Sequence, residues 1–329
     1  MKKYFKKIVV NSFILLLSVI FLCYINNKIQ LKKESTILQP IGKLVKINKK
    51  TIHVYAEGEG NLTCVFMSGL GNTASIIDMK PLYKNLSNDY RIALVDKLGY
   101  GFSATSSDPR NLDTIIYETR NALNLAGEKP PYVLFPHSIS GIEAIYWAQK
   151  YPKEIKGIIG LDIGFPEAYV SQGIKSSEIL LIKLQSLLVK LGVHRLVPSI
   201  TFDCNVLNSN LISDNDKKIY KALTYKNLLS NNVVNEFSSA ISNSKKSLNL
   251  KLPTKTPICI FLAVPLTEKE RIEKSNLISS RVDYYKNYLS KFEHSKLITS
   301  PGKHSIYLYT PEIIANESKK FLDEIYNIS

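Results

Sequence analysis

Short apolar runs alternate with segments long enough to be helices along most of this chain. The apolar runs predict strands at residues 43–47, 51–56, 62–67, 90–95, 132–136, 157–161, 258–264 and 295–299, and helical patterns lie near residues 75–86, 112–126, 139–150, 279–290 and 311–326. Strands of a parallel sheet are buried on both faces and need crossover connections, usually helices. The pattern therefore predicts the α/β class, with a doubly wound, mostly parallel sheet whose first two strands form an antiparallel pair.

The alternation stops after the sixth predicted strand and resumes near residue 258. Residues 165–250 contain helical patterns, such as the apolar segment from Glu178 to Leu191, but no clear strand. We therefore expect a core made of residues 41–164 and 251–329, with residues 165–250 inserted between them as a helical cap.

The N-terminus begins with four lysines before an uncharged, mostly apolar run at residues 8–27. Twenty such residues are enough to cross ~30 Å of hydrocarbon as a helix. A cleaved signal peptide remains an alternative, although the exit from the run, Phe21 to Asn27, has no small-x-small cleavage site. The prediction is a retained single-span membrane anchor at residues 1–27 and a polar stalk at residues 28–40. The lysine bias places the N-terminus in the cytoplasm and the catalytic domain outside it, at the cell membrane.

Nearly half of the net positive charge lies near the N-terminus. The formal net charge is +15, but seven lysines and no acidic residue lie in the first 33 residues, which leaves 36 basic and 28 acidic residues for the rest. These are scattered without a basic stripe, so no nucleic-acid partner is expected. The cysteines at positions 23, 64, 204 and 259 have no metal-site or disulfide spacing, so no metal is expected.

The predicted strand at residues 132–136 is followed directly by the predicted helix at residues 139–150, and Ser138 lies in the turn between them. Such a turn raises a hydroxyl above the sheet at a helix N-terminus, where backbone amides stabilise negative charge. The segment Pro136-His-Ser-Ile-Ser-Gly141 resembles the nucleophile elbow of the α/β-hydrolase family, usually G-H-S-x-G-G, with two glycines replaced. The resemblance makes Ser138 the catalytic nucleophile of a serine hydrolase.

Three further segments resemble this family in the order in which the family has them. Met67-Ser-Gly-Leu-Gly71 is similar to the H-G-x-G oxyanion segment, and the resemblance assigns the oxyanion-hole N–H groups to Leu70 and Ile139. The loop from Asp96 to Ser103 is similar to the family's D-x-x-G-x-G-x-S loop, which supplies no catalytic group. Pro301-Gly-Lys-His304 stands seven residues before Pro311-Glu312, the family's position for the catalytic histidine, which makes His304 the general base.

The acid that would orient His304 has two possible positions. Asp162 stands at the carboxyl end of the sixth apolar strand, an end that faces the catalytic rim of a doubly wound sheet. After the seventh core strand the family's alternative acid position offers Glu268 or Glu270. We expect Asp162 to complete the triad and keep Glu268 as its principal alternative.

The function implied by this resemblance is hydrolysis of a carboxylic ester through an acyl-serine intermediate. The expected substrate is a small-molecule ester or a lipid-like acyl compound, no cofactor is needed, and the membrane is contacted through the N-terminal helix. One alternative is an aminopeptidase of the proline-releasing type, which uses the same scaffold. Another is a catalytically inactive hydrolase fold acting as an exported binding or sensor protein.

Overall fold

A mostly parallel sheet forms the centre of the protein in a computed structural model that describes residues 2–326. Within these residues the sheet has eight strands in the order β1-β2-β4-β3-β5-β6-β7-β8. Their bounds are Lys43–Ile47 (β1), Lys50–Glu57 (β2), Thr63–Met67 (β3), Arg91–Asp96 (β4), Tyr132–Pro136 (β5), Ile155–Leu161 (β6), Ile258–Val264 (β7) and Ser295–Pro301 (β8). The β1-β2 and β2-β4 pairs are antiparallel and the remaining pairs are parallel. The predicted sheet is therefore confirmed.

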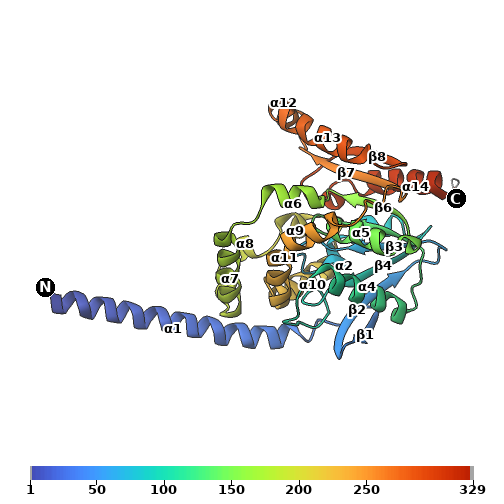
Figure 1. Ribbon diagram of the computed structural model, residues 1–329. Helices are drawn as coiled ribbons and strands as arrows, with labels where there is room; N and C mark the ends of the chain where they lie inside the picture. Colours follow the sequence, from blue (N-terminus) through green and yellow to red (C-terminus); the bar gives the residue numbers. More distant parts are fainter. Residues whose placement is uncertain (1, 327–329) are drawn as a thin grey trace.

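Helices cover both faces of the sheet (Figure 1). One face packs against α4 (Leu112–Ala126), α5 (Ser140–Lys150) and α13 (Ser275–Leu289), and the other against α2 (Ser75–Asp78), α3 (Lys80–Lys84) and α14 (Pro311–Tyr326). Successive strand residues divide between the two cores: Val65 belongs to the first and its neighbour Cys64 to the second. The alternation arises because successive side chains of a β-strand point to opposite faces of the sheet. Short elements complete the core: the 3-10 turns η1 (Pro152–Glu154) and η3 (Ile306–Leu308), and the helix α12 (Glu268–Glu273).

One predicted helix differs in the structure. Residues 75–86 form two short helices, α2 and α3, with Met79 between them. Pro81 stands at the beginning of α3, where its missing N–H is tolerated, whereas inside a continuous helix its ring would clash with the carbonyl of the preceding turn.

Only helices lie between β6 and β7 among the described residues. They are α6 (Pro166–Gln172), α7 (Ser176–Lys190), η2 (Val193–Leu196), α8 (Pro198–Thr201), α9 (Cys204–Asn208), α10 (Asp214–Asn227) and α11 (Asn231–Leu248). We call these the cap helices. Residues of α8 to α10 line a cavity together with the loops that follow β3 and β5, so the cap helices lie over the carboxyl ends of the parallel strands.

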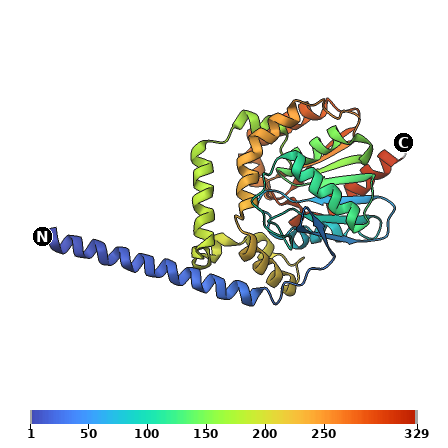
Figure 2. The ribbon, with the colours of Figure 1, turned by 60° about the horizontal axis from the view of Figure 1, so that its bottom comes forward.

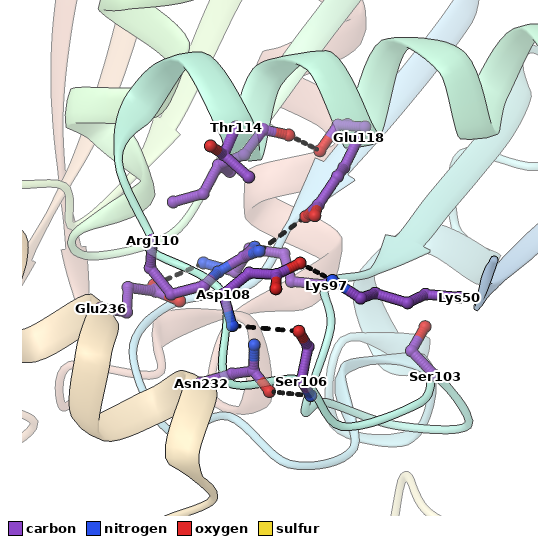
Figure 3. Close-up of polar contacts among 12 residues, drawn as sticks. Lys50, Lys97, Ser103, Ser106, Asp108, Arg110, Thr114, Glu118, Asn232 and Glu236 are labelled. Atoms are coloured by element: carbon purple, nitrogen blue, oxygen red, sulfur yellow. Dashed lines mark hydrogen bonds and ion pairs between the residues drawn. The ribbon is translucent and has the colours of Figure 1, made fainter. Parts of the chain in front are cut away.

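Buried polar contacts join the cap helices to the core. In Figure 3, Asn232 of α11 accepts a hydrogen bond from the N–H of Ser106 (2.8 Å), and Lys97, in the loop after β4, contacts Glu236 of α11 (2.6 Å). The same Lys97 ammonium also contacts Glu143 of α5 at 2.8 Å. One buried lysine therefore links a core loop, the helix that begins next to Ser138 and the cap.

The N-terminal helix α1 (Lys2–Glu34) projects from the folded domain (Figures 1 and 2). It is long and apolar enough to cross a membrane, and most of it is exposed. It continues past residue 27 into the segment expected to be a stalk. Glu34 accepts two hydrogen bonds from the guanidinium of Arg195, at 2.7 Å each, and this contact stabilises the additional helical turns.

Candidate active site

Ser138 occupies the turn between β5 and α5. Its φ is +56°, a left-handed backbone conformation that is uncommon for a residue with a side chain. The Ser138 carbonyl accepts hydrogen bonds from the N–H groups of Gly141 and Gly164, both at 3.1 Å, which hold the turn against the loop after β6. Strained backbone of this kind persists where surrounding contacts over-determine it, and it clusters at functional sites.

Ser140 explains how the elbow forms without one of the family's glycines. Its buried hydroxyl lies 2.7 Å from the His137 carbonyl and 3.0 Å from the Met67 carbonyl, and it accepts a hydrogen bond from the His137 N–H (2.8 Å). The hydroxyl therefore links the elbow to the end of β3. The other replaced glycine, Pro136, is the last residue of β5 and pairs with Met67, so the missing amide falls at a strand end.

The loop after β3 approaches Ser138 closely because residue 69 is glycine. A Cβ on Gly69 would lie 2.8 Å from Nδ1 of His137 and 3.0 Å from Cβ of Ser138. The next residue, Leu70, lines a cavity together with Ser138, and Ile139 directly follows the serine. Among the hydrogen bonds of the described residues, neither the Leu70 N–H nor the Ile139 N–H is used as a donor.

Three predicted side chains form one hydrogen-bonded chain. Nε2 of His304 lies 2.8 Å from Oγ of Ser138, and Nδ1 of His304 lies 2.7 Å from Oδ2 of Asp162. Ser138 follows β5, Asp162 follows β6 and His304 follows β8, so three strand ends contribute to the same rim of the sheet. The structure thus brings together the serine, the acid and the histidine expected from the sequence.

The Asp162 carboxylate is buried and held on both oxygens. Its Oδ1 accepts hydrogen bonds from the Ala263 N–H (2.9 Å) and from Arg281 (3.1 Å), and its own φ is +47°. Burial alone would raise the pKa of Asp162, but the hydrogen bonds from His304 and Ala263, together with the charge of Arg281, outweigh burial and lower it. The carboxylate is therefore ionised at neutral pH, as an orienting acid must be.

The other residues considered from the sequence do not take part in the hydrogen-bonded chain of Ser138, His304 and Asp162. Glu268 is exposed on α12, and no hydrogen bond or ion pair among the described residues joins it to His304. The N–H of Glu270 donates to the Thr267 hydroxyl, which caps the same helix. Asp96 is buried 2.7 Å from Nδ1 of His53, away from the Ser138 chain. His137 is buried beside His304, with ring centroids 4.7 Å apart, and burial followed by the His304 charge lowers the pKa of His137 to about 3.

Two cavities meet at Ser138 and His304. The smaller, of about 250 Å³, extends from Leu70 toward Asp78 and Asp203, while the larger, of about 530 Å³, extends toward Tyr169 and Tyr284. The smaller cavity therefore has an acidic end, and the larger has an aromatic wall. Burial, followed by smaller contributions that include the nearby Asp203, raises the pKa of Asp78 to about 7.

Two residues of this site were not expected from the sequence. Arg281, on α13, contacts Asp162 and also donates to the Ala263 carbonyl (3.1 Å). Tyr169, on the cap helix α6, lies against Ser138: burial raises its pKa to about 12, and the contact with Ser138 partly opposes that rise. No motif marked either residue, because each reaches the site from a helix whose placement depends on tertiary packing.

No group of three or more potential metal ligands of the His, Cys, Asp and Glu types occurs in residues 2–326. Ser138, His304 and Asp162 are of the residue types that serve as nucleophile, general base and orienting acid in covalent catalysis.

Comparisons with known proteins agree with this architecture. The sequence profile described as alpha/beta hydrolase fold matches residues 65–180. The uncharacterized protein YbdG of Bacillus subtilis strain 168 is 40% identical over 323 residues, which cover 98% of each chain. The uncharacterized protein YqjL of the same strain is 31% identical over 108 residues, covering 33% of this chain and 42% of its own.

Solved structures share the fold at low sequence identity. A thermophilic esterase from Thermogutta terrifontis superposes with a TM-score of 0.61 at 13% identity, covering 87% of this chain and 99% of the esterase. The enol-lactonase from Burkholderia xenovorans LB400 superposes with a TM-score of 0.56 at 13% identity, covering 85% and 100%. The chain belongs to the α/β-hydrolase fold family.

Proposed function

We propose that this protein is a serine hydrolase that cleaves carboxylic esters through an acyl-serine intermediate. The observation that carries the proposal is the chain from Ser138 through His304 to Asp162, with distances of 2.8 and 2.7 Å. These distances are within hydrogen-bonding reach, which is the geometric requirement for a base that activates a serine.

In the proposed reaction, Oγ of Ser138 attacks the ester carbonyl while Nε2 of His304 accepts the hydroxyl proton. The N–H groups of Leu70 and Ile139 stabilise the oxyanion, and Asp162 stabilises the positive imidazolium. Collapse of the tetrahedral intermediate releases the alcohol, which takes the proton from His304. A water molecule, deprotonated by His304, then attacks the acyl-serine. The second tetrahedral intermediate collapses as His304 returns the proton to Oγ of Ser138, and the carboxylic acid is released.

The test is covalent labelling with a fluorophosphonate, which modifies activated serines, together with turnover of chromogenic esters of increasing chain length. We expect wild-type protein to be labelled, and we expect Ser138→Ala to lose both labelling and turnover while keeping its thermal unfolding transition. The substitution removes one hydroxyl and no core volume, so the fold should persist. Full esterase activity in Ser138→Ala would contradict the nucleophile assignment.

Absence of labelling in well-folded wild-type protein would favour the alternative of an inactive hydrolase fold that binds or senses a ligand.

A second candidate is an aminopeptidase, and the acidic end of the smaller cavity favours it. A free amino terminus requires a carboxylate partner, and Asp203 of the cap and Asp78 of the core both line the cavity that contains Ser138. Amino-acid arylamides assayed beside the esters distinguish the two candidates. Higher kcat/KM for arylamides with a free amine than for their acetylated forms would support the aminopeptidase.

We further propose that α1 anchors the enzyme in the cell membrane with the catalytic domain outside the cytoplasm. The length and apolar composition of α1 and the four lysines before its apolar run support this placement. A lipid-like ester would then be available close to the site.

A further inference from the structure

The cap helix α7 is apolar on two faces, and only one of them is covered. On the inner face, Ser186 is buried and donates a hydrogen bond to the Leu229 carbonyl (2.7 Å). Ile182 and Val189, which flank Ser186 on the helix, are half-buried on this side. This face packs against the rest of the cap and accounts for one apolar stripe.

The outer face of α7 carries five leucines that are roughly half exposed, between 46% and 58%: Leu180, Leu181, Leu184, Leu187 and Leu188. At 3.6 residues per turn they fall within an arc of ~120°. Leu196, Val197 and Ile200 extend the exposed apolar residues beyond α7, and Ile200 is 82% exposed. We call these eight residues the leucine surface. Soluble proteins rarely expose a large contiguous apolar patch without a partner for it.

α1 contacts the cap at Gly192 and Arg195, which lie between the α7 leucines and Leu196 in the chain. Gly192, two residues after α7, lies so close to α1 that an added Cβ would be 2.5 Å from the Cys23 carbonyl oxygen. Cys23 and Asn27 are buried there. Arg195 donates hydrogen bonds to the side chain of Asn27 (2.6 Å) and to both carboxylate oxygens of Glu34. The position of the leucine surface relative to α1 is therefore set by direct contacts.

This contact lies at the end of the apolar run of α1. Residues 8–27 span ~30 Å as a helix, which matches the hydrocarbon thickness. Cys23 stands four residues before the end of the run, or ~6 Å along the helix axis. Helices that lie in a membrane interface bury their apolar face by about 5–10 Å. The level of Cys23 is therefore the level at which an interfacial helix lies.

The direction of α7 fits the same plane. Both ribbon views show α7 running across the direction of α1, on the side of the fold toward which the N-terminal part of α1 projects (Figures 1 and 2). Lys175 and Lys190 stand at the two ends of α7, and Lys183 borders the leucine arc. Exposed lysines beside an apolar face are suited to the headgroups of anionic lipids.

We propose that the leucine surface lies in the interfacial layer of a lipid bilayer, so that the enzyme contacts the membrane through its cap as well as through α1. This inference rests on the proposed anchoring by α1. It also places the active site next to lipid, because Thr201, the neighbour of Ile200, lines the cavity that contains Ser138. The substrate class that this arrangement favours is an amphiphilic ester drawn from the bilayer.

The test uses the full chain in vesicles of phosphatidylcholine and phosphatidylglycerol. Leu184→Cys is labelled with an environment-sensitive fluorophore in a Cys204→Ser background, since Cys204 is the one exposed cysteine among the described residues. The matched control is Leu125→Cys on α4, a leucine of similar exposure on a helix that packs on the sheet away from α1. Lipids with a nitroxide near the headgroup should remove most of the fluorescence at position 184 and leave position 125 unchanged.

Equal, weak quenching at both positions would overturn the inference. Disulfide-linked dimers of unlabelled Leu184→Cys, formed without lipid quenching, would overturn it in favour of a second copy of this chain on the leucine surface. Loss of the protein from washed vesicles would overturn it through its premise, the anchor. Fluorophosphonate labelling of Ser138 in the same vesicles tests the proposed hydrolase function separately, because quenching does not depend on turnover.

Discussion

At the scale of single residues, Asp162 is buried and hydrogen-bonded on both carboxylate oxygens. This arrangement suits its proposed role as the acid that orients His304. One carboxylate oxygen contacts His304, and the other accepts from Ala263 and Arg281. An amide at this position would keep the volume but would present a donor or a neutral acceptor to the imidazole. It would therefore disturb the tautomer of His304 and lose the charge that stabilises the imidazolium.

We predict that Asp162→Asn lowers kcat for a chromogenic ester by at least ~100-fold, in line with the loss found when a triad acid becomes an amide. Glu268→Gln is the matched control and should change kcat little, because Glu268 is exposed on α12. Steady-state kinetics of both variants provide the measurement. The reverse ranking would transfer the acid role to Glu268.

A second buried carboxylate, Asp96, contacts a histidine outside the active site. Nδ1 of His53 lies 2.7 Å from Asp96, and Nε2 lies 2.7 Å from the Ile41 carbonyl, so both ring nitrogens face acceptors. Burial would lower the pKa of His53, but the hydrogen bond and charge of Asp96 outweigh it and raise the pKa. The folded state therefore binds this proton more tightly than the unfolded state.

The contribution of His53 to stability is fully present below pH ~6.5, its unfolded value, and is lost as the pH rises through the raised folded value. We predict that His53→Gln lowers the melting temperature most at mildly acidic pH, and that the difference from wild type shrinks as the pH rises above neutral. Thermal unfolding across this pH range is the measurement. A difference that grows with pH would contradict a protonated His53.

At the scale of elements, Lys97 links a core loop to α5 and α11. Its ammonium contacts Glu143 and Glu236, and Tyr100 donates to the second oxygen of Glu236 (2.9 Å). Burial would lower the pKa of Lys97, but the attraction of the two carboxylates raises it. The Gly71 N–H, in the proposed oxyanion loop, donates to the Tyr100 hydroxyl at 3.3 Å, so this cluster also supports the active site.

Removing the charge of Lys97 would leave two carboxylates buried without their cation. We predict that Lys97→Met lowers the free energy of unfolding by about 3–5 kcal/mol, the usual cost of breaking a buried ion pair. Lys153→Met, at an exposed position, is the control and should change it little. Denaturant unfolding followed by circular dichroism measures both. Equal stabilities of the two variants would show that the cluster does not hold the cap.

Elements with strong local signals could be predicted from the sequence. The strands β1, β5 and β7 and the helices α4 and α14 have the predicted bounds, because apolar runs, an Asn cap and a Gly end determine them locally. The end of α1 could not be predicted, since Arg195 stabilises it from a segment more than 160 residues away. Ser138, Asp162 and His304 were predicted from strand ends and motifs. Arg281 and Tyr169 could not be predicted, because each reaches the site from a helix whose placement depends on tertiary packing.

At the scale of the whole molecule, the proposed anchor would determine where the protein is found. We predict that the full chain stays with the membrane pellet after alkaline carbonate washing, because about twenty apolar residues of α1 remain in hydrocarbon. Immunoblotting of the pellet and supernatant is the measurement. A chain beginning at Pro40, which lacks α1, is the control and should appear in the supernatant.

Protease added to intact cells tests the proposed orientation. It should digest the catalytic domain of the full chain, whereas protection of that domain would mean that the orientation is reversed.

The two hydrogen bonds that the Arg195 guanidinium donates to Glu34 have a consequence for the positions relative to a membrane that the active site can reach. A hydrolase on a loose tether would sweep a hemisphere and reach targets at many heights. In this protein the Arg195 guanidinium donates to both carboxylate oxygens of Glu34. Because Gly192 has no side chain, α1 packs directly against the cap. If α1 spans the membrane as proposed, these contacts hold Ser138 at one height above the bilayer, and the proposed hydrolase would meet its substrates by lateral diffusion in two dimensions.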